Sequence, residues 1–184
     1  MDSQIYDKLY EFAYKMAFRD ATMRNAFRRL DDEEESHFKA IKEEMRNNYV
    51  DYVKEYIEAI FREQYPQPLE YIEKISNPGL VNHNERFTFG NAQKLINMTA
   101  KYMFLSCYQD ETKRELFRNC DCPMDSFMIK KVECNHDKGF NHDLAWSRIT
   151  FSNHDAYDYF QEQIRKQCGR RLLPIEYDYL HWDE

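Results

Sequence analysis

The sequence has few of the residues that build tight turns, with four glycines and five prolines among 184 residues. A sandwich or barrel of short strands needs many such turns, so this composition argues against a turn-dense all-β fold. No apolar run approaches the roughly 20 residues needed to cross a bilayer, and the N-terminus shows no signal-peptide pattern. Five cysteines, an odd number, without a secretory signal indicate free thiols in a reducing compartment. We therefore expect a cytoplasmic protein with no membrane contact.

Aromatic side chains and acidic charge are abundant instead. Fourteen tyrosines and thirteen phenylalanines predict a core rich in aromatic rings, which bury much area per residue. The net charge of −7 argues against a protein that coats nucleic acid with a general basic surface. Residues 86–131 depart from this average, because eight lysines and arginines stand against five acidic residues there, a net charge of +3. The composition therefore still allows a local basic groove.

Apolar residues recur every three or four positions in residues 3–29 and again in residues 34–63, which predicts two amphipathic helices. The acidic run Asp31–Glu35 between them suits a helix start, where the helix dipole favours negative charge. We expect residues 1–66 to form an antiparallel helical hairpin and residues 67–184 a compact helical core, joined in one globular unit. The hairpin has two interpretations: an arm that forms a homo-oligomer, or a pair packed on the rest of the domain.

The remainder of the chain also predicts mainly helices. Gly169 is expected to close the last of them as a C-cap, because glycine tolerates the left-handed conformation. The segment Ile175–Tyr179 alternates hydrophobic and acidic residues, which predicts an extended segment, with an edge strand as one form of it. We thus expect a mainly α, multi-helix domain with a long N-terminal helical hairpin and a short extended C-terminal segment. The further predicted helices span residues 69–75, 90–107, 111–118, 123–132 and 154–167.

Two turns in residues 87–132 each place a polar side chain at the start of a predicted helix. The first, Gly-Asn-Ala-Gln-Lys, delivers Lys94, and the second, Cys-Pro-Met-Asp, delivers Asp125. This stretch resembles the helix-hairpin-helix DNA glycosylases, in which a glycine-rich hairpin leads into a lysine-bearing helix and a later turn carries an aspartate. The resemblance implies that Lys94 is the amine nucleophile and Asp125 the catalytic carboxylate. The single glycine of this hairpin and the 31 positions between the two residues depart from the family pattern and imply an insertion near residues 110–118.

The resemblance also implies a DNA partner, and we expect no cofactor. Such an enzyme flips a base out of the duplex, a carboxylate offsets positive charge on the sugar, and a desolvated lysine attacks C1′ to give a Schiff base. Backbone N–H groups of the hairpin are expected to hold a phosphate. The residues expected to contact nucleic acid are Arg86, Gly90, Gln93, Asn97, Lys101, Lys130 and Lys131.

The two signature residues also have structural interpretations. Lys94 can lie on the solvated face of an amphipathic helix, and Asp125 is favourable near a helix N-terminus for the dipole alone. The alternative function is then a non-catalytic helical module that binds itself or another protein through the N-terminal hairpin.

Cysteines and histidine form a candidate metal site at Cys120, Cys122, Cys134 and His136. Four soft ligands at this separation could hold a structural zinc ion in a tetrahedron, while buried free thiols are the alternative interpretation. Cys122, at a predicted helix start, is also a candidate nucleophile with a lowered pKa.

Overall fold

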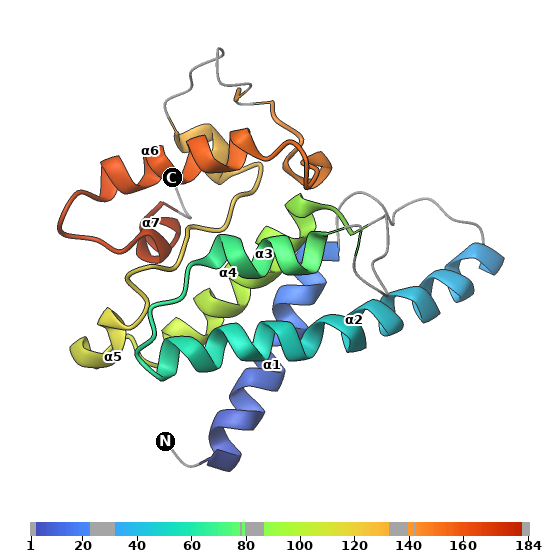
Figure 1. Cartoon of the computed structure of the whole chain (residues 1–184), viewed down its shortest axis with the longest axis horizontal. Helices are drawn as coiled ribbons and strands as arrows, with labels where there is room; N and C mark the ends of the chain where they lie inside the picture. Colours follow the sequence, from blue (N-terminus) through green and yellow to red (C-terminus); the bar gives the residue numbers. More distant parts are fainter. Residues whose placement is uncertain are drawn as a thin grey trace.

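The fold is mainly α-helical, as predicted (Figure 1). The computed structural model describes residues 3–22, 32–77, 79, 87–132, 140–141 and 143–181. These residues contain no strand, and their β-type pairing is one isolated bridge between Thr150 and Asn153. Among the described helices, none combines the length and the apolarity that crossing a membrane requires. The α-helices are α1 (Ser3–Thr22), α2 (Asp32–Phe61), α3 (Pro68–Ser76), α4 (Phe89–Leu105), α5 (Glu111–Glu115), α6 (Asp155–Cys168) and α7 (Pro174–Leu180), and 3₁₀ helices span Met128–Lys131 and Trp146–Arg148.

The two N-terminal helices contact each other in antiparallel order. The Tyr10 hydroxyl donates to Val50 O and the Tyr14 hydroxyl donates to Arg46 O, both at 2.6 Å. In Figure 1 α1 crosses α2, and it packs more extensively on α4 than on α2. Residues 23–31, which connect the two helices, lie outside the described part of the chain. The helix pair is therefore packed on the rest of the described fold.

The core is aromatic, as the composition predicts. Phe117 lies between Phe61 of α2 and Phe104 of α4, with edge-to-face ring centroids 5.7 and 5.5 Å away. Such contacts each contribute about 0.5–1.5 kcal/mol beyond the area that they bury. The largest fully buried side chains include Tyr56, Tyr157, Phe87, Phe89, Phe104, Phe117, Phe140 and Phe160.

Helix α4 is the central element, with α1, α2, α3 and the 3₁₀ helix Trp146–Arg148 packed against it. A capping box begins it: the Asn91 N–H donates to Thr88 Oγ1 (3.2 Å) and the Thr88 N–H donates to Asn91 Oδ1 (3.1 Å). Gly90 allows a close approach in the first turn, because a Cβ there would lie 1.9 Å from Trp146 O. As a result, α4 is buried on nearly all sides.

Four predicted helices match the observed α2, α3, α4 and α6 to within two residues at each end. Gly169 follows α6 with a φ of 58°, which confirms the predicted C-cap. The helix predicted over residues 111–118 is shorter, because α5 ends at Glu115.

The predicted extended C-terminal segment is wrong, because Pro174–Leu180 is the helix α7. Pro174 stands in the first turn, where a helix does not need its missing N–H. The Glu176 carboxylate accepts a hydrogen bond from the Leu173 N–H (2.9 Å) and pairs with Arg114 (Nη2–Oε2 2.6 Å). The alternation of hydrophobic and acidic residues is misleading here, since the acidic side chains point into the protein rather than to solvent.

Candidate active site

A cleft of about 750 Å³ opens beside α4, and we name it the Lys94 cleft. Four residues singled out in the sequence line it: Lys94, Lys101, Asp125 and Lys130. Aromatic and acidic side chains from α1, α4, α7, the segment after Asp125 and the 3₁₀ helix Trp146–Arg148 complete the wall. These further lining residues include Asp20, Tyr102, Phe127, Trp146 and Tyr179.

Lys94 and Asp125 meet in this cleft. Lys94 Nζ lies 2.8 Å from Asp125 Oδ2, and the two side chains are 7% and 17% exposed. The other carboxylate oxygen, Oδ1, accepts hydrogen bonds from the N–H groups of Phe127 (2.9 Å) and Met128 (2.8 Å). Burial alone would raise the pKa of Asp125, but the Lys94 ammonium and these N–H donors outweigh it and hold the pKa below its usual value. Asp125 is therefore an ionised carboxylate at neutral pH.

The local structure around Asp125 differs from the predicted helix over residues 123–132. The chain runs without regular structure through residue 125, and a 3₁₀ helix begins only at Met128. The physical reason is that Asp125 uses its side chain to bond the N–H groups two and three residues on, a local alternative to a helical turn. Asp125 thus owes its position to this turn rather than to an α-helix N-terminus.

Gln93, Asn97 and Lys101 lie four residues apart on α4 and form a polar line that faces the protein interior. In this conformation the side chains of Gln93 and Asn97 do not make the nucleic-acid contacts that we expected. Gln93 and Asn97 are fully buried. Gln93 bonds the main chain of Met124, and Asn97 donates to the Tyr157 hydroxyl at 2.9 Å. A polar line is typical of a solvated face only where one side of the helix is exposed, and α4 is covered on nearly every side.

Lys101 lines the Lys94 cleft and is paired inside the fold with Asp178 of α7. Asp178 is fully buried, and burial raises the pKa of this carboxyl while the Lys101 ammonium opposes the rise. The sequence did not point to Asp178, because 77 positions separate the two residues and no local pattern connects them. Tyr102, whose hydroxyl donates to Asp20 at 2.7 Å, was missed for the same reason.

The remaining expected nucleic-acid residues have different surroundings. The Gly90 N–H donates to Ile149 O (3.1 Å) and so is not free to hold a phosphate. Lys130 is exposed at the cleft, and Lys131 Nζ lies 5.3 Å from the centre of the Phe127 ring. Arg86 lies outside the described residues.

Two of the four candidate zinc ligands, Cys120 and Cys122, lie in the described part of the chain. Cys120 and Cys122 are buried, and the Tyr56 hydroxyl donates to Cys120 Sγ at 3.3 Å. Burial raises the pKa of the Cys120 thiol to about 12 and that of Cys122 well above its usual value. Protonated thiols are poor nucleophiles, which argues against the nucleophilic role expected for Cys122. Cys134 and His136 lie outside the described residues, and the described part of the chain holds no group of three or more potential metal ligands.

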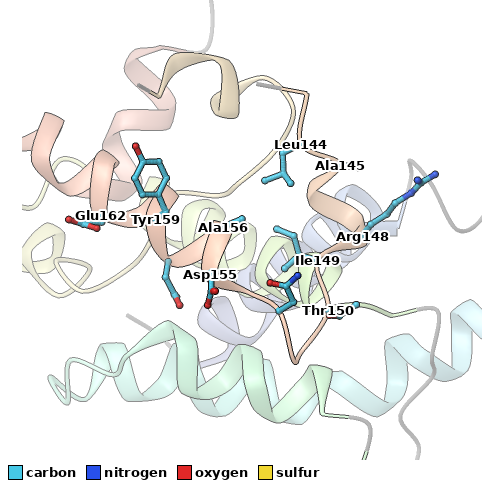
Figure 2. Close-up of a pocket in the computed structure, with 11 residues that line it drawn as sticks. Leu144, Ala145, Arg148, Ile149, Thr150, Asp155, Ala156, Tyr159 and Glu162 are labelled. Atoms are coloured by element: carbon cyan, nitrogen blue, oxygen red, sulfur yellow. The ribbon is translucent and has the colours of Figure 1, made fainter. Parts of the chain in front are cut away.

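A second cavity, of about 820 Å³, lies between residues 144–150 and the first half of α6 (Figure 2). Asp155, Asp158 and Glu162 of α6 line it, and Figure 2 shows Arg148 at the opposite end from Glu162. No residue singled out in the sequence lines this cavity. Its acidic wall does not suit a polyanion such as DNA.

Comparison of the chain with protein-family models, curated proteins and solved structures finds no match. The function is therefore argued from the geometry of the Lys94 cleft.

Proposed function

We propose that the Lys94 cleft is the active site of a DNA-directed enzyme that removes a base, with Lys94 as nucleophile and Asp125 as its catalytic carboxylate. The observation that carries this proposal is the 2.8 Å contact between Lys94 Nζ and Asp125 Oδ2 at the wall of a cleft open to solvent. The two residues are 31 positions apart and come from different elements. An amine and an ionised carboxylate in such a cleft are what Schiff-base chemistry requires.

The chemistry begins with a proton transfer. The Lys94 ammonium must lose one proton before it can attack, and Asp125 Oδ2 is an acceptor within hydrogen-bond reach. The nitrogen lone pair then forms a bond to C1′ of the deoxyribose while the bond from C1′ to the base breaks, and its electron pair leaves with the base. The departing base takes up the proton released by the nitrogen. The nitrogen lone pair restored by this proton loss then opens the C1′–O4′ bond and gives the iminium that borohydride reduces, while O4′ takes up the proton held by Asp125.

The walls of the cleft suit the substrate of such a reaction. Phe127 and Trp146 offer aromatic side chains, on which a displaced base can stack for about 1–3 kcal/mol. Lys130 is exposed beside Phe127, where its ammonium can contact a backbone phosphate. Because the charges of Lys94 and Asp125 offset each other, Lys130 is the one of these three residues that attracts the DNA backbone.

Borohydride trapping tests the proposed reaction. The protein is mixed with duplexes carrying abasic sites or damaged bases, and we expect a covalent protein–DNA adduct that mass spectrometry locates at Lys94. Lys94→Arg should abolish it, because the guanidinium keeps the positive charge beside Asp125 but remains protonated and cannot attack. Lys113→Arg is the matched control, since Lys113 also pairs with an aspartate, at 3.1 Å, but on the open surface. The proposal fails if no substrate yields an adduct, or if Lys94→Arg traps as well as the parent protein.

A second candidate function, a non-catalytic interaction module, is favoured by one observation. The outer face of α1 exposes Ile5 (62%) and Phe12 (57%) to solvent, with the half-buried Leu9 between them. Their spacing of four and three residues forms an apolar stripe like the seam of a helix pair. Tyr49 and Tyr56 of α2 lie in the core and so do not offer such a surface, whereas Tyr52 is 36% exposed.

Light scattering tests self-association through this stripe. We expect the parent protein to exceed the monomer mass and the double variant Ile5→Asp, Phe12→Asp to be monomeric, because each carboxylate would make burial of the stripe unfavourable. Leu180→Asp is the control, since Leu180 is similarly exposed (56%) but lies on α7. A parent protein that remains monomeric over the accessible concentration range would rule out this association.

A further inference from the structure

The segment Cys120–Met124 is buried without regular secondary structure, and two glutamine side chains bond its main chain. Buried backbone groups need partners, because each unpaired group costs about 1–3 kcal/mol. From α6, Gln161 donates to Cys122 O (2.7 Å) and accepts from the Cys122 N–H (3.1 Å). From α4, Gln93 donates to Met124 O (2.8 Å) and accepts from the Met124 N–H (3.1 Å). The segment is thus held from both sides by side-chain amides in place of neighbouring strands.

Gln93 stands directly before Lys94 on α4, and Met124 stands directly before Asp125 in the segment. Two adjacent side chains of one helix therefore hold two adjacent residues of the other element. Gln93 holds the Met124 main chain, and Lys94 contacts the Asp125 carboxylate. Any shift of the Met124 main chain would move Asp125 relative to Lys94.

The orientation of the Gln93 amide is itself defined by a buried network. Gln93 Oε1 also accepts from Asn97 Nδ2 (3.4 Å), and Asn97 is held by the Tyr157 hydroxyl. That hydroxyl donates to Asp121 Oδ2 (2.8 Å), and the same carboxylate pairs with Arg165 (Oδ1–Nη2 2.5 Å). The network begins at a charged pair near the surface and ends at the amide, so the Gln93 oxygen and nitrogen cannot exchange places without breaking it.

We propose that Gln93 is a positioning residue, whose amide fixes the Met124 main chain so that Asp125 stands opposite Lys94. It acts through Asp125, since its own side chain is fully buried and is bonded to the protein. The inference rests on the proposed function, because that function gives the Lys94–Asp125 pair its catalytic role. The positioning itself can be measured without any substrate.

Gln161 supplies a matched control for this proposal. It makes the same pair of hydrogen bonds to the same segment, but at Cys122, three residues before Asp125. Gln93→Met and Gln161→Met each remove one amide and leave one N–H and one C=O unpaired, so both should lose a similar amount of stability. A purely structural role would make the two variants alike in every measurement.

The experiment is a pH titration of the Asp125 side-chain carboxyl, followed by carbon-13 NMR in the full-length protein without DNA. Lys94 holds the pKa of Asp125 below its usual value, so opening of the pair should raise it. We expect Gln93→Met to raise the Asp125 pKa toward that of an ordinary aspartate and Gln161→Met to leave it as in the parent protein. An unchanged pKa in Gln93→Met, or an equal rise in both variants, would overturn the proposal.

A second pair of variants covers the case in which Gln93→Met does not fold. Gln93→Asn keeps an uncharged amide on a side chain that is one methylene shorter, and it is compared with Gln161→Asn by the same titration and the same criteria. In the trapping assay we expect the Gln93 variant to react about 100-fold more slowly than its Gln161 counterpart, the size of loss typical of a 1 Å misplacement. If the parent protein traps no DNA, the proposed function fails, while the titration still decides whether Gln93 positions Asp125.

Discussion

Replacing Lys101 with methionine should lower the free energy of unfolding by about 3–5 kcal/mol, the usual cost of breaking a buried ion pair from one side. Asp178 would be left as a fully buried carboxylate without its cation, and its Oδ1 already has no hydrogen-bond partner among the described residues. Methionine is a close match in length, and its sulfur suits the Tyr179 ring that Lys101 Nζ now faces at 4.5 Å. The loss is measured by urea denaturation followed by circular dichroism.

Two further measurements separate the charge from the packing. The double variant Lys101→Met, Asp178→Leu should regain most of the lost stability, because no charge remains buried. In the single variant the carboxyl pKa would rise further above its unfolded value, so folding takes up a proton. Its stability deficit should therefore shrink as pH falls from above the folded pKa to below the unfolded one. A deficit that is independent of pH, or a double variant as unstable as the single one, would contradict this account of the pair.

Asp125→Asn should slow formation of the borohydride-trapped adduct by about 100–10,000-fold, the range typical of losing a general base. The amide keeps the size of the side chain and can still accept from the Phe127 and Met128 N–H groups, but it cannot accept a proton from Lys94. The rate is measured from single-turnover trapping at a series of pH values.

The pH dependence has a definite sign. Because the pKa of Asp125 is held below its usual value, the carboxylate persists as pH falls, and the parent protein should lose adduct formation only at strongly acidic pH. The Asn variant should not show this loss of adduct formation at strongly acidic pH, because it has no carboxylate to protonate at position 125. Asp110→Asn is the control, because Asp110 also accepts from a backbone N–H and pairs with a lysine, yet lies on the surface. Equal rates for Asp125→Asn and Asp110→Asn would remove Asp125 from the mechanism.

Helix positions were predictable because their causes are local. The apolar spacing of α4 and α6 and the glycine after α6 act over a few residues, and these elements form close to where the pattern predicts. The predictions failed where a distant partner decides the conformation. The tail forms the helix α7. Its Glu176 pairs with Arg114, 62 positions away, and its Asp178 pairs with Lys101, 77 positions away.

The candidate site shows the same division. Lys94 and Asp125 were selected from the turns that carry them, but their contact depends on the path of the segment before Asp125. Gln93 and Gln161 hold that path across 31 and 39 positions, and neither was expected to do so. Gln93 was instead expected to bind nucleic acid, because a polar line along a helix cannot be assigned to solvent, ligand or core until the neighbours of the helix are known.

By itself the sequence determined a mainly α chain, an aromatic core, most helix boundaries and the two residues on which the proposed chemistry depends. These properties follow from composition, from apolar periodicity and from caps, which act within a few residues of the chain. Only the tertiary structure decided that Lys94 and Asp125 meet, that the polar line of α4 faces inward, and that the tail is helical. Each of these depends on buried charges and amides that must find partners, and the partners come from distant parts of the chain.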